Sequence, residues 1–260
     1  MPSLEPWSVW MLTSPNKACS YSSIMGMKKV LSGSALKVIA MVSMLIDHLA
    51  YFLWLDAPVF FQPLFTIGDN VITPYFLMRM VGRLSFPIFA FLIVEGFVHT
   101  RSRRKYGRNL LVFALLSELP WNFVHSGTWH YFGQNVLFTL FFGFLGLCAI
   151  EYYKDQRNRL AFSLIGLLVL TVFFCADYGC RGYVFILFLY VLRESKLLQA
   201  VIGSCMMGPP WAAGLAFIPI NMYNQQRGFI KGNYAKYAIY VFYPLHLLII
   251  FLVRKYFYGF

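Results

Sequence analysis

Long apolar segments, separated by short polar or charged turns, fill most of the 260-residue chain. The continuous segments run over residues 36–55, 75–97, 110–124, 135–152, 160–176, 182–192 and 235–253. A further apolar stretch at 197–222 contains Gly208-Pro209-Pro210, so it either crosses a membrane once or turns back as a re-entrant hairpin. A helix needs about 20 apolar residues to cross a bilayer. The pattern therefore predicts an all-α fold, a polytopic helical membrane protein with about seven or eight transmembrane helices.

The composition supports a membrane protein. Hydrophobic residues make up 59% of the chain and charged residues only 12%, whereas soluble domains have roughly 45–50% and about 25%. So little polar surface cannot cover a water-soluble globule, which excludes a soluble enzyme, a disulfide-rich secreted scaffold and a disordered tail. The formal net charge of +12 indicates orientation signals and headgroup contacts. We therefore expect membrane lipids, and not nucleic acid, as partners.

Basic residues alternate between the two ends of the predicted spans. Lys28-Lys29 precede the first span, five basic residues crowd 101–108, and three fall within 154–159. The turns at 56–69 and 126–133 contain no Lys or Arg. The positive-inside rule then predicts a multi-pass membrane protein with a cytoplasmic N-terminus. The side of the C-terminus depends on the path of the 197–222 stretch.

The first residues differ from the rest of the chain. Residues 1–27 hold Pro, Ser, Trp and Asn without a continuous apolar run, so they do not form a signal peptide. We interpret them as a disordered leader or as the result of a mis-called start codon. We expect residues 28–260 to form a single transmembrane domain.

Ionisable residues inside the predicted spans are candidates for a functional or pairing role. Placing each one at the centre of a transmembrane helix costs at least about 2.5–3.5 kcal/mol of free energy. Lys37 and His48 share one face of the first helix and lie about 16 Å apart along its axis. Asp47 adjoins His48, but neighbouring side chains on a helix diverge, so a direct contact is not implied. The antiparallel second helix returns Arg79 and Arg83 to the depth of His48. There Arg83 could hold an anionic ligand, orient a carboxylate, or simply pair with Asp47.

Other polar residues extend this set. Glu95 and His99 lie one turn apart at the cytoplasmic end of the second span. The basic cluster at 101–108 is either a topology determinant or a site for a phosphorylated ligand, because Arg pairs phosphate oxygens bidentately. The remaining candidates are Glu118, Asp177, Tyr243 and His246. No zinc-protease, serine-hydrolase or phosphate-loop motif occurs and the five His are scattered, so we expect no metal.

Five segments resemble, in order, those of TraX family proteins. They are LKVIA and MLIDH within 36–48, RLSFPIFAFLIVEGF at 83–97, QNVLFTL at 134–140, DYG at 177–179 and FYPLH at 242–246. The family's namesake is implicated in N-terminal acetylation of conjugative pilin. The resemblance implies an integral acetyltransferase of the bacterial cytoplasmic (inner) membrane that takes an acetyl group from cytoplasmic acetyl-CoA, as co-substrate. The acceptor would be a protein N-terminus, as in a pilin-like protein, or a glycan.

A more distant similarity to transmembrane acyltransferases points the same way. Those enzymes carry a basic residue, ten intervening residues and a catalytic His in the first helix, a spacing that Lys37 and His48 share, with Lys where Arg is usual. Glu95-Gly96-Phe97 is similar to the end of their Phe-rich helix, with Glu in place of Ser, and an Arg-rich loop follows. Their RxxR motif becomes Arg104-x-x-x-Arg108 here.

These resemblances imply roles for the candidate residues. His48 would be the general base, with Asp47 or Arg83 orienting it or stabilising developing charge. Four basic residues would hold the CoA: Lys37, Arg103, Arg104 and Arg108. Six would contact or support the substrates: Arg79, Glu95, Glu118, Asp177, Tyr243 and His246. Two other classes stay open, a small-anion transporter and a non-catalytic membrane assembly factor.

Overall fold

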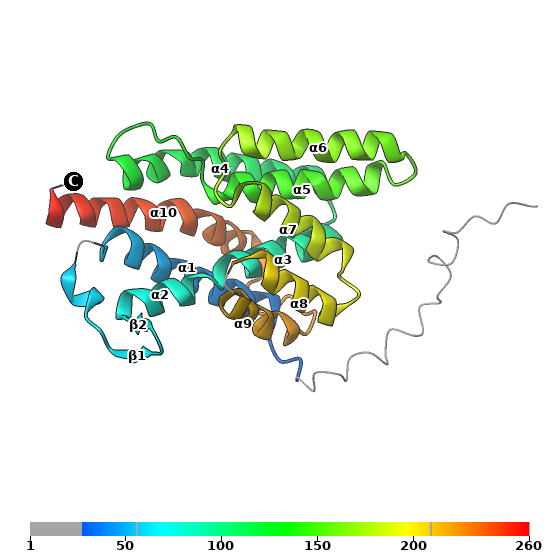
Figure 1. Ribbon diagram of the computed structural model, residues 1–260. Helices are drawn as coiled ribbons and strands as arrows, with labels where there is room; N and C mark the ends of the chain where they lie inside the picture. Colours follow the sequence, from blue (N-terminus) through cyan, green and yellow to red (C-terminus); the bar gives the residue numbers. More distant parts are fainter. Residues whose placement is uncertain (1–27, 56, 209, 260) are drawn as a thin grey trace, which may run out of the picture.

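The computed structural model describes residues 28–55, 57–208 and 210–259, so the predicted leader at 1–27 lies outside the described residues. Most of the described chain is helical, which confirms the all-α prediction (Figure 1). The helices are α1 Gly33–Phe52, α2 Pro74–Gly82, α3 Ser85–His99, α4 Arg103–Ser126, α5 Val136–Tyr152, α6 Arg157–Phe173, α7 Gly179–Val191, α8 Lys196–Met206, α9 Pro210–Asn221 and α10 Gly232–Tyr258.

A small hairpin between α1 and α2 was not predicted. It follows the 3-10 helix η3 Pro58–Phe61 and consists of β1 Phe65–Ile67 and β2 Asn70–Ile72, paired antiparallel. Gly68 and Asp69 form the two-residue turn, and Gly68 has a φ of 58°, which glycine adopts without strain. Strands of three residues are too short to show the alternation that identifies a strand in a sequence.

The predicted helix over 75–97 is interrupted. Helix α2 ends at Gly82 and α3 begins at Ser85, with Arg83 and Leu84 between them. Pro87 explains the position of the break, because it has no N–H with which to bond the Arg83 carbonyl. The break lets α2 lie against α1 while α3 continues through the centre of the molecule.

The apolar stretch at 197–222 forms two helices, α8 and α9, that pack against each other as a hairpin (Figure 1). They have 11 and 12 residues, or about 16–18 Å each, well short of the roughly 30 Å hydrocarbon core. The sequence left open whether this stretch crosses the membrane once or folds back as a hairpin, and the structure shows the hairpin.

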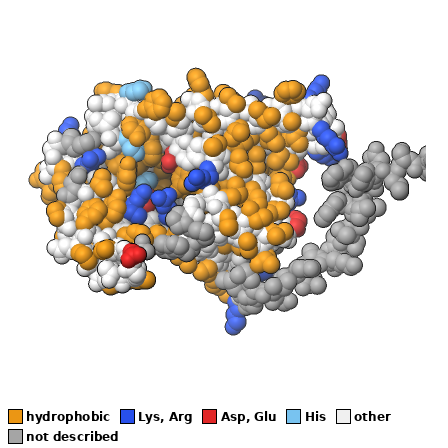
Figure 2. Space-filling view, in the orientation of Figure 1, with side chains coloured by type: hydrophobic (Ala, Val, Ile, Leu, Met, Phe, Trp, Pro, Cys, Tyr) orange, Lys and Arg blue, Asp and Glu red, His pale blue; other side chains and the backbone are white. Residues whose placement is uncertain are grey.

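Three helical stretches within the described residues are long and apolar enough to cross a membrane: Gly33–Phe52, Pro74–His99 and Tyr237–Tyr258. Hydrophobic side chains also cover much of the face shown in Figure 2, as expected for a protein whose solvent is lipid. These features indicate a membrane protein. The count of seven or eight spans is not confirmed, and α7, α8 and α9 are too short to cross a full bilayer unaided.

Helix α3 lies at the centre of the core. It packs against α1, α5, α7 and α9, and its side chains are buried on nearly every face, including Phe86, Phe91 and Phe97. A helix that is apolar on most faces is typical of a protein core or a membrane span, and here four neighbouring helices surround it. Helices α4 and α10 pack along each other and close the molecule beside α1.

Candidate functional site

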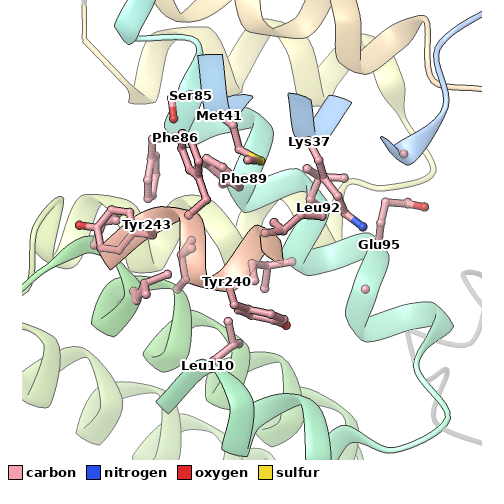
Figure 3. Close-up of a pocket in the computed structure, with 18 of the residues that line it drawn as sticks. Lys37, Met41, Ser85, Phe86, Phe89, Leu92, Glu95, Leu110, Tyr240 and Tyr243 are labelled. Carbon is pink, nitrogen blue, oxygen red and sulfur yellow. The ribbon is translucent and has the colours of Figure 1, made fainter. Parts of the chain in front are cut away.

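A cavity of about 660 Å³ runs between α1, α3, α4 and α10. In Figure 3, Lys37 and Glu95 lie at one end, while Ser85, Phe86 and Tyr243 lie at the other. Apolar and aromatic side chains form the wall between them: Met41, Phe89, Leu92, Leu110 and Tyr240. Figure 2 shows basic, acidic and His side chains gathered around a hollow in a largely hydrophobic face.

One end of the cavity is bordered by basic side chains, which we call the basic rim: Lys37, Arg101, Lys105 and Arg227. They come from α1, the turn between α3 and α4 with the start of α4, and the loop after α9. Glu95 is the acidic residue among them, and its carboxylate lies 3.7 Å from Nδ1 of His99, one turn along α3. The same nitrogen of His99 lies 2.9 Å from the Glu95 backbone carbonyl oxygen. The basic rim offers several positive charges to an anionic ligand.

His48 lines the cavity about 16 Å further along α1 from Lys37. Its Nδ1 lies 2.7 Å from Nε2 of His246 on α10. His246 is 5% exposed, and its own Nδ1 lies 2.8 Å from the Phe242 carbonyl oxygen. No described residue hydrogen-bonds to Nε2 of His48. The site thus leaves one ring nitrogen of His48 available to a ligand.

Asp47 points to a different partner. One carboxylate oxygen lies 2.6 Å from the Arg79 guanidinium on α2, and the other is buried with no hydrogen-bond partner among the described residues. Gly82 permits this close approach, since a Cβ there would lie 2.1 Å from the carboxylate. Asp47 and His48 therefore make no mutual bond, as the helical geometry predicts. The ion pair joins α1 to α2 beside the cavity.

Asp177 reaches the cavity from the turn between α6 and α7. Its backbone N–H donates to the Gln134 carbonyl, and its own carbonyl accepts from the Thr139 hydroxyl. Tyr178 has a φ of 64°, a conformation that non-glycine residues rarely adopt. Its ring stacks on Phe86 at 3.8 Å. The turn is thus held in a strained conformation by bonds on both sides, as is common at functional sites.

The surroundings of Asp177 change its acidity. Burial raises the pKa of its carboxyl to about 6, and the nearby Asp47 also raises it. The Tyr178 N–H and the guanidinium groups of Arg79 and Arg83 act in the opposite direction. The side chain therefore changes its charge near neutral pH, where an ordinary Asp is fully ionised.

The comparisons with known proteins identify the family of the chain. The family model described as TraX protein matches residues 32–254, which is most of the chain. The chain belongs to the TraX family. It is 28% identical over 251 residues to the "Probable fimbrial assembly protein FimC, serogroup H1" of Dichelobacter nodosus, covering 84% of this chain and 94% of the relative. No solved structure is significantly similar.

Several candidates from the sequence come together in the cavity. Lys37, Asp47, His48, Glu95, Asp177 and Tyr243 all line it. Arg79 and His246 stand directly behind Asp47 and His48. Four segments that are distant in the sequence therefore meet at this cavity: α1, α3, the α6–α7 turn and α10.

The expected burial of Arg83 is wrong. Its side chain is exposed and does not line the cavity, whereas Arg79, one turn earlier, pairs with Asp47. The sequence predicted one continuous helix over 75–97. Arg83 ends α2 in a helical conformation, with its N–H bonded to the Arg79 carbonyl. Its guanidinium still lowers the pKa of Asp177, but the ion pair with Asp47 is made by Arg79.

The basic side chains of 101–108 that line the cavity are not the ones predicted to hold the CoA. Arg103 lies over the Phe97 ring and 3.7 Å from the Glu151 carboxylate, while Arg104 and Arg108 are exposed away from the lining. Arg101 and Lys105 line the cavity instead. Ser102 caps α4, and the turns that follow it decide which basic side chains face inward.

Glu118 also lies elsewhere. Its carboxylate accepts a hydrogen bond of 2.6 Å from Nδ2 of Asn135, the residue that caps α5. Asn135 in turn donates to the Ala114 carbonyl. Glu118 thus joins α4 to the start of α5 and does not line the cavity.

Several lining residues escaped the sequence analysis, among them Arg227, Tyr178 and Ser85. Arg227 belongs to a loop whose backbone accepts bonds from Gly33 and Ser34, which places it beside the start of α1. No local pattern reveals that contact. Tyr178 and Ser85, in contrast, belong to segments already identified as TraX-like, and either could have been proposed from them.

Proposed function

We propose that this TraX family protein is an integral membrane acetyltransferase of the bacterial cytoplasmic membrane that uses acetyl-CoA. One observation supports the proposal above all: a single cavity leads from the basic rim to His48. In this account the basic rim holds the CoA phosphates, and the pantetheine arm follows the apolar wall along Met41 and Phe89. The thioester then reaches the end of the cavity where His48 lies.

The chemistry assigned to His48 is general base catalysis. The acceptor amine or hydroxyl attacks the thioester carbonyl carbon, and its proton passes to Nε2 of His48. The carbon–sulfur bond breaks, and the CoA thiolate leaves and takes up that proton. The products are the acetylated acceptor and CoA. The basic rim would face the cytoplasm, where acetyl-CoA is available, in keeping with a cytoplasmic N-terminus.

For the acceptor we propose a protein N-terminus of the pilin type or a glycan. The name of the Dichelobacter nodosus relative connects that protein with fimbrial assembly, and the TraX resemblance connects the family with pilin acetylation. Asp47 and Asp177 provide acidic groups in the same cavity as His48 that would suit a polar acceptor.

The test is acetyl-CoA turnover by the purified protein in proteoliposomes, with an envelope extract as the source of acceptor. We expect His48→Ala to lose at least about 100-fold in turnover, the usual size of a general-base contribution. His130→Ala is the matched control, because His130 is exposed and lies outside the cavity. Turnover that is equal in both variants, or absent from the wild type, would contradict the proposal and favour a transporter or an assembly factor.

The donor site has its own test. Arg101→Gln and Lys105→Gln should raise KM for acetyl-CoA, while Arg104→Gln, which lies outside the lining, should not. An equal effect of all three would show a general charge effect and no defined phosphate site.

A further inference from the structure

A chain of two imidazole rings connects His48 to the backbone of α10. Nδ1 of His48 and Nε2 of His246 are 2.7 Å apart, and the ring planes are inclined by only 5°. The other nitrogen of His246 lies 2.8 Å from the Phe242 carbonyl oxygen. The Phe242 ring lies against His246 at 4.9 Å and helps to fix its orientation.

The carbonyl at the end of this chain determines where the protons lie. A carbonyl oxygen only accepts, so Nδ1 of His246 carries hydrogen and donates to Phe242. In neutral His246 the Nε2 atom is then an acceptor, and the hydrogen between the rings belongs to Nδ1 of His48. His48 is left with a free lone pair on Nε2, the nitrogen that no described residue engages.

Asp47 does not provide this alignment, although it is the carboxylate nearest in sequence. Its bonded oxygen faces Arg79 at 2.6 Å. The other titratable or charged groups that act on His48 are His125 of α4 and Arg79 of α2, and Nδ1 of His125 lies 2.9 Å from the Trp121 carbonyl oxygen. The group that bonds to His48 is therefore His246.

We propose that His246 is the positioning residue of the acetyl transfer, which fixes His48 in the tautomer whose Nε2 is the base. The inference rests on the function proposed above. When Nε2 of His48 takes the proton of the acceptor, the hydrogen on Nδ1 can move to Nε2 of His246. The positive charge is then shared by two rings, and it returns to His48 when the thiolate leaves with the proton.

The experiment compares His246→Leu with His246→Gln in the reconstituted turnover assay. Gln places an oxygen near the position of Nε2 of His246, so it can accept from His48, whereas Leu fills similar space without an acceptor. We expect His246→Leu to lower kcat about 100-fold with KM for acetyl-CoA within about twofold of wild type. His246→Gln should recover most of kcat. Leu245→Ala, an exposed neighbour on α10, should behave as wild type.

The outcomes separate the two proposals. If the wild type turns over acetyl-CoA through His48 but His246→Leu keeps its kcat, the positioning role is overturned and the proposed function stands. If Leu and Gln lower kcat equally, or if the loss is in KM, His246 only packs the site and the inference is also overturned. If the wild type does not turn over acetyl-CoA at all, the proposed function itself fails, and the positioning role with it.

Discussion

The side chains of Asp47 and His48 are neighbours in the sequence and have separate partners in the structure. Asp47 pairs with Arg79 on α2, and His48 bonds to His246 on α10. Helical geometry predicts that the two diverge, but it does not predict which residue each one meets. His246 is 198 positions away from His48, so only the packing of α1 against α10 brings them together.

Asp177 leads to a prediction about stability and pH. An unfolded Asp titrates near a pKa of about 3.9, whereas burial raises the pKa of Asp177 in the folded protein to about 6. Between these values the folded state binds the extra proton, so the free energy of unfolding should fall as pH rises through this interval. Asp177→Asn should remove that fall.

The measurement is the thermal midpoint in detergent from pH 4 to pH 7 for the wild type and Asp177→Asn. Asp69→Asn, in the exposed turn of the β-hairpin, is the control and should follow the wild type. Parallel curves for the wild type and Asp177→Asn would show that Asp177 titrates normally and is not a buried acid.

At the scale of elements, the apolar pattern located the helices well and their interruptions poorly. The predicted segments at 110–124, 135–152 and 160–176 each fall largely on one helix. The interruptions arise from a few residues: Pro87 accounts for the break between α2 and α3, and Gly208-Pro209-Pro210 separates α8 from α9. Hydropathy averages over such residues and therefore does not locate the interruptions.

The packing of α5 against α7 depends on glycine. A Cβ at Gly143 would lie 2.4 Å from the end of the Ile186 side chain and 3.1 Å from its Cβ. Small residues allow helices to approach closely in a membrane protein. Gly143→Ala should therefore lower the free energy of unfolding by about 1–3 kcal/mol, the usual cost of overpacking.

The comparison for this prediction is Gly166→Ala in α6, where a Cβ meets nothing within 4 Å. That variant should keep or slightly raise the midpoint of unfolding, because Ala favours a helix by about 1 kcal/mol over Gly. A midpoint for Gly143→Ala equal to that of Gly166→Ala would contradict the close packing of α5 and α7.

At the scale of the whole molecule, the basic rim and the β-hairpin lie toward opposite ends of α1. Helix α1 has 20 residues, which corresponds to about 30 Å, the thickness of a hydrocarbon core. If the basic rim faces the cytoplasm, the hairpin faces the other side. The positive-inside pattern predicts this orientation from the sequence. The cavity itself could not be predicted in the same way, because segments that are far apart in the sequence line it.

Thiol labelling of intact cells tests that orientation. In a chain whose native cysteines are replaced by Ser, Asp69→Cys in the hairpin should react with a membrane-impermeant maleimide. Arg104→Cys, exposed beside the basic rim, should react only after the cells are opened. The reverse pattern would place the basic rim away from cytoplasmic acetyl-CoA and contradict the donor route.

The central claim is that the thioester of acetyl-CoA lies beside His48, and photolabelling tests it most directly. An acyl-CoA with a photoreactive acyl group would be cross-linked to the reconstituted protein and the modified peptides identified by mass spectrometry. The account predicts labels on the cavity wall around His48, at Met44, Ser85, Phe86 and Phe242, and their loss in excess acetyl-CoA. Labelling confined to exposed residues such as Phe162 and Ile165 of α6, or unaffected by acetyl-CoA, would contradict it.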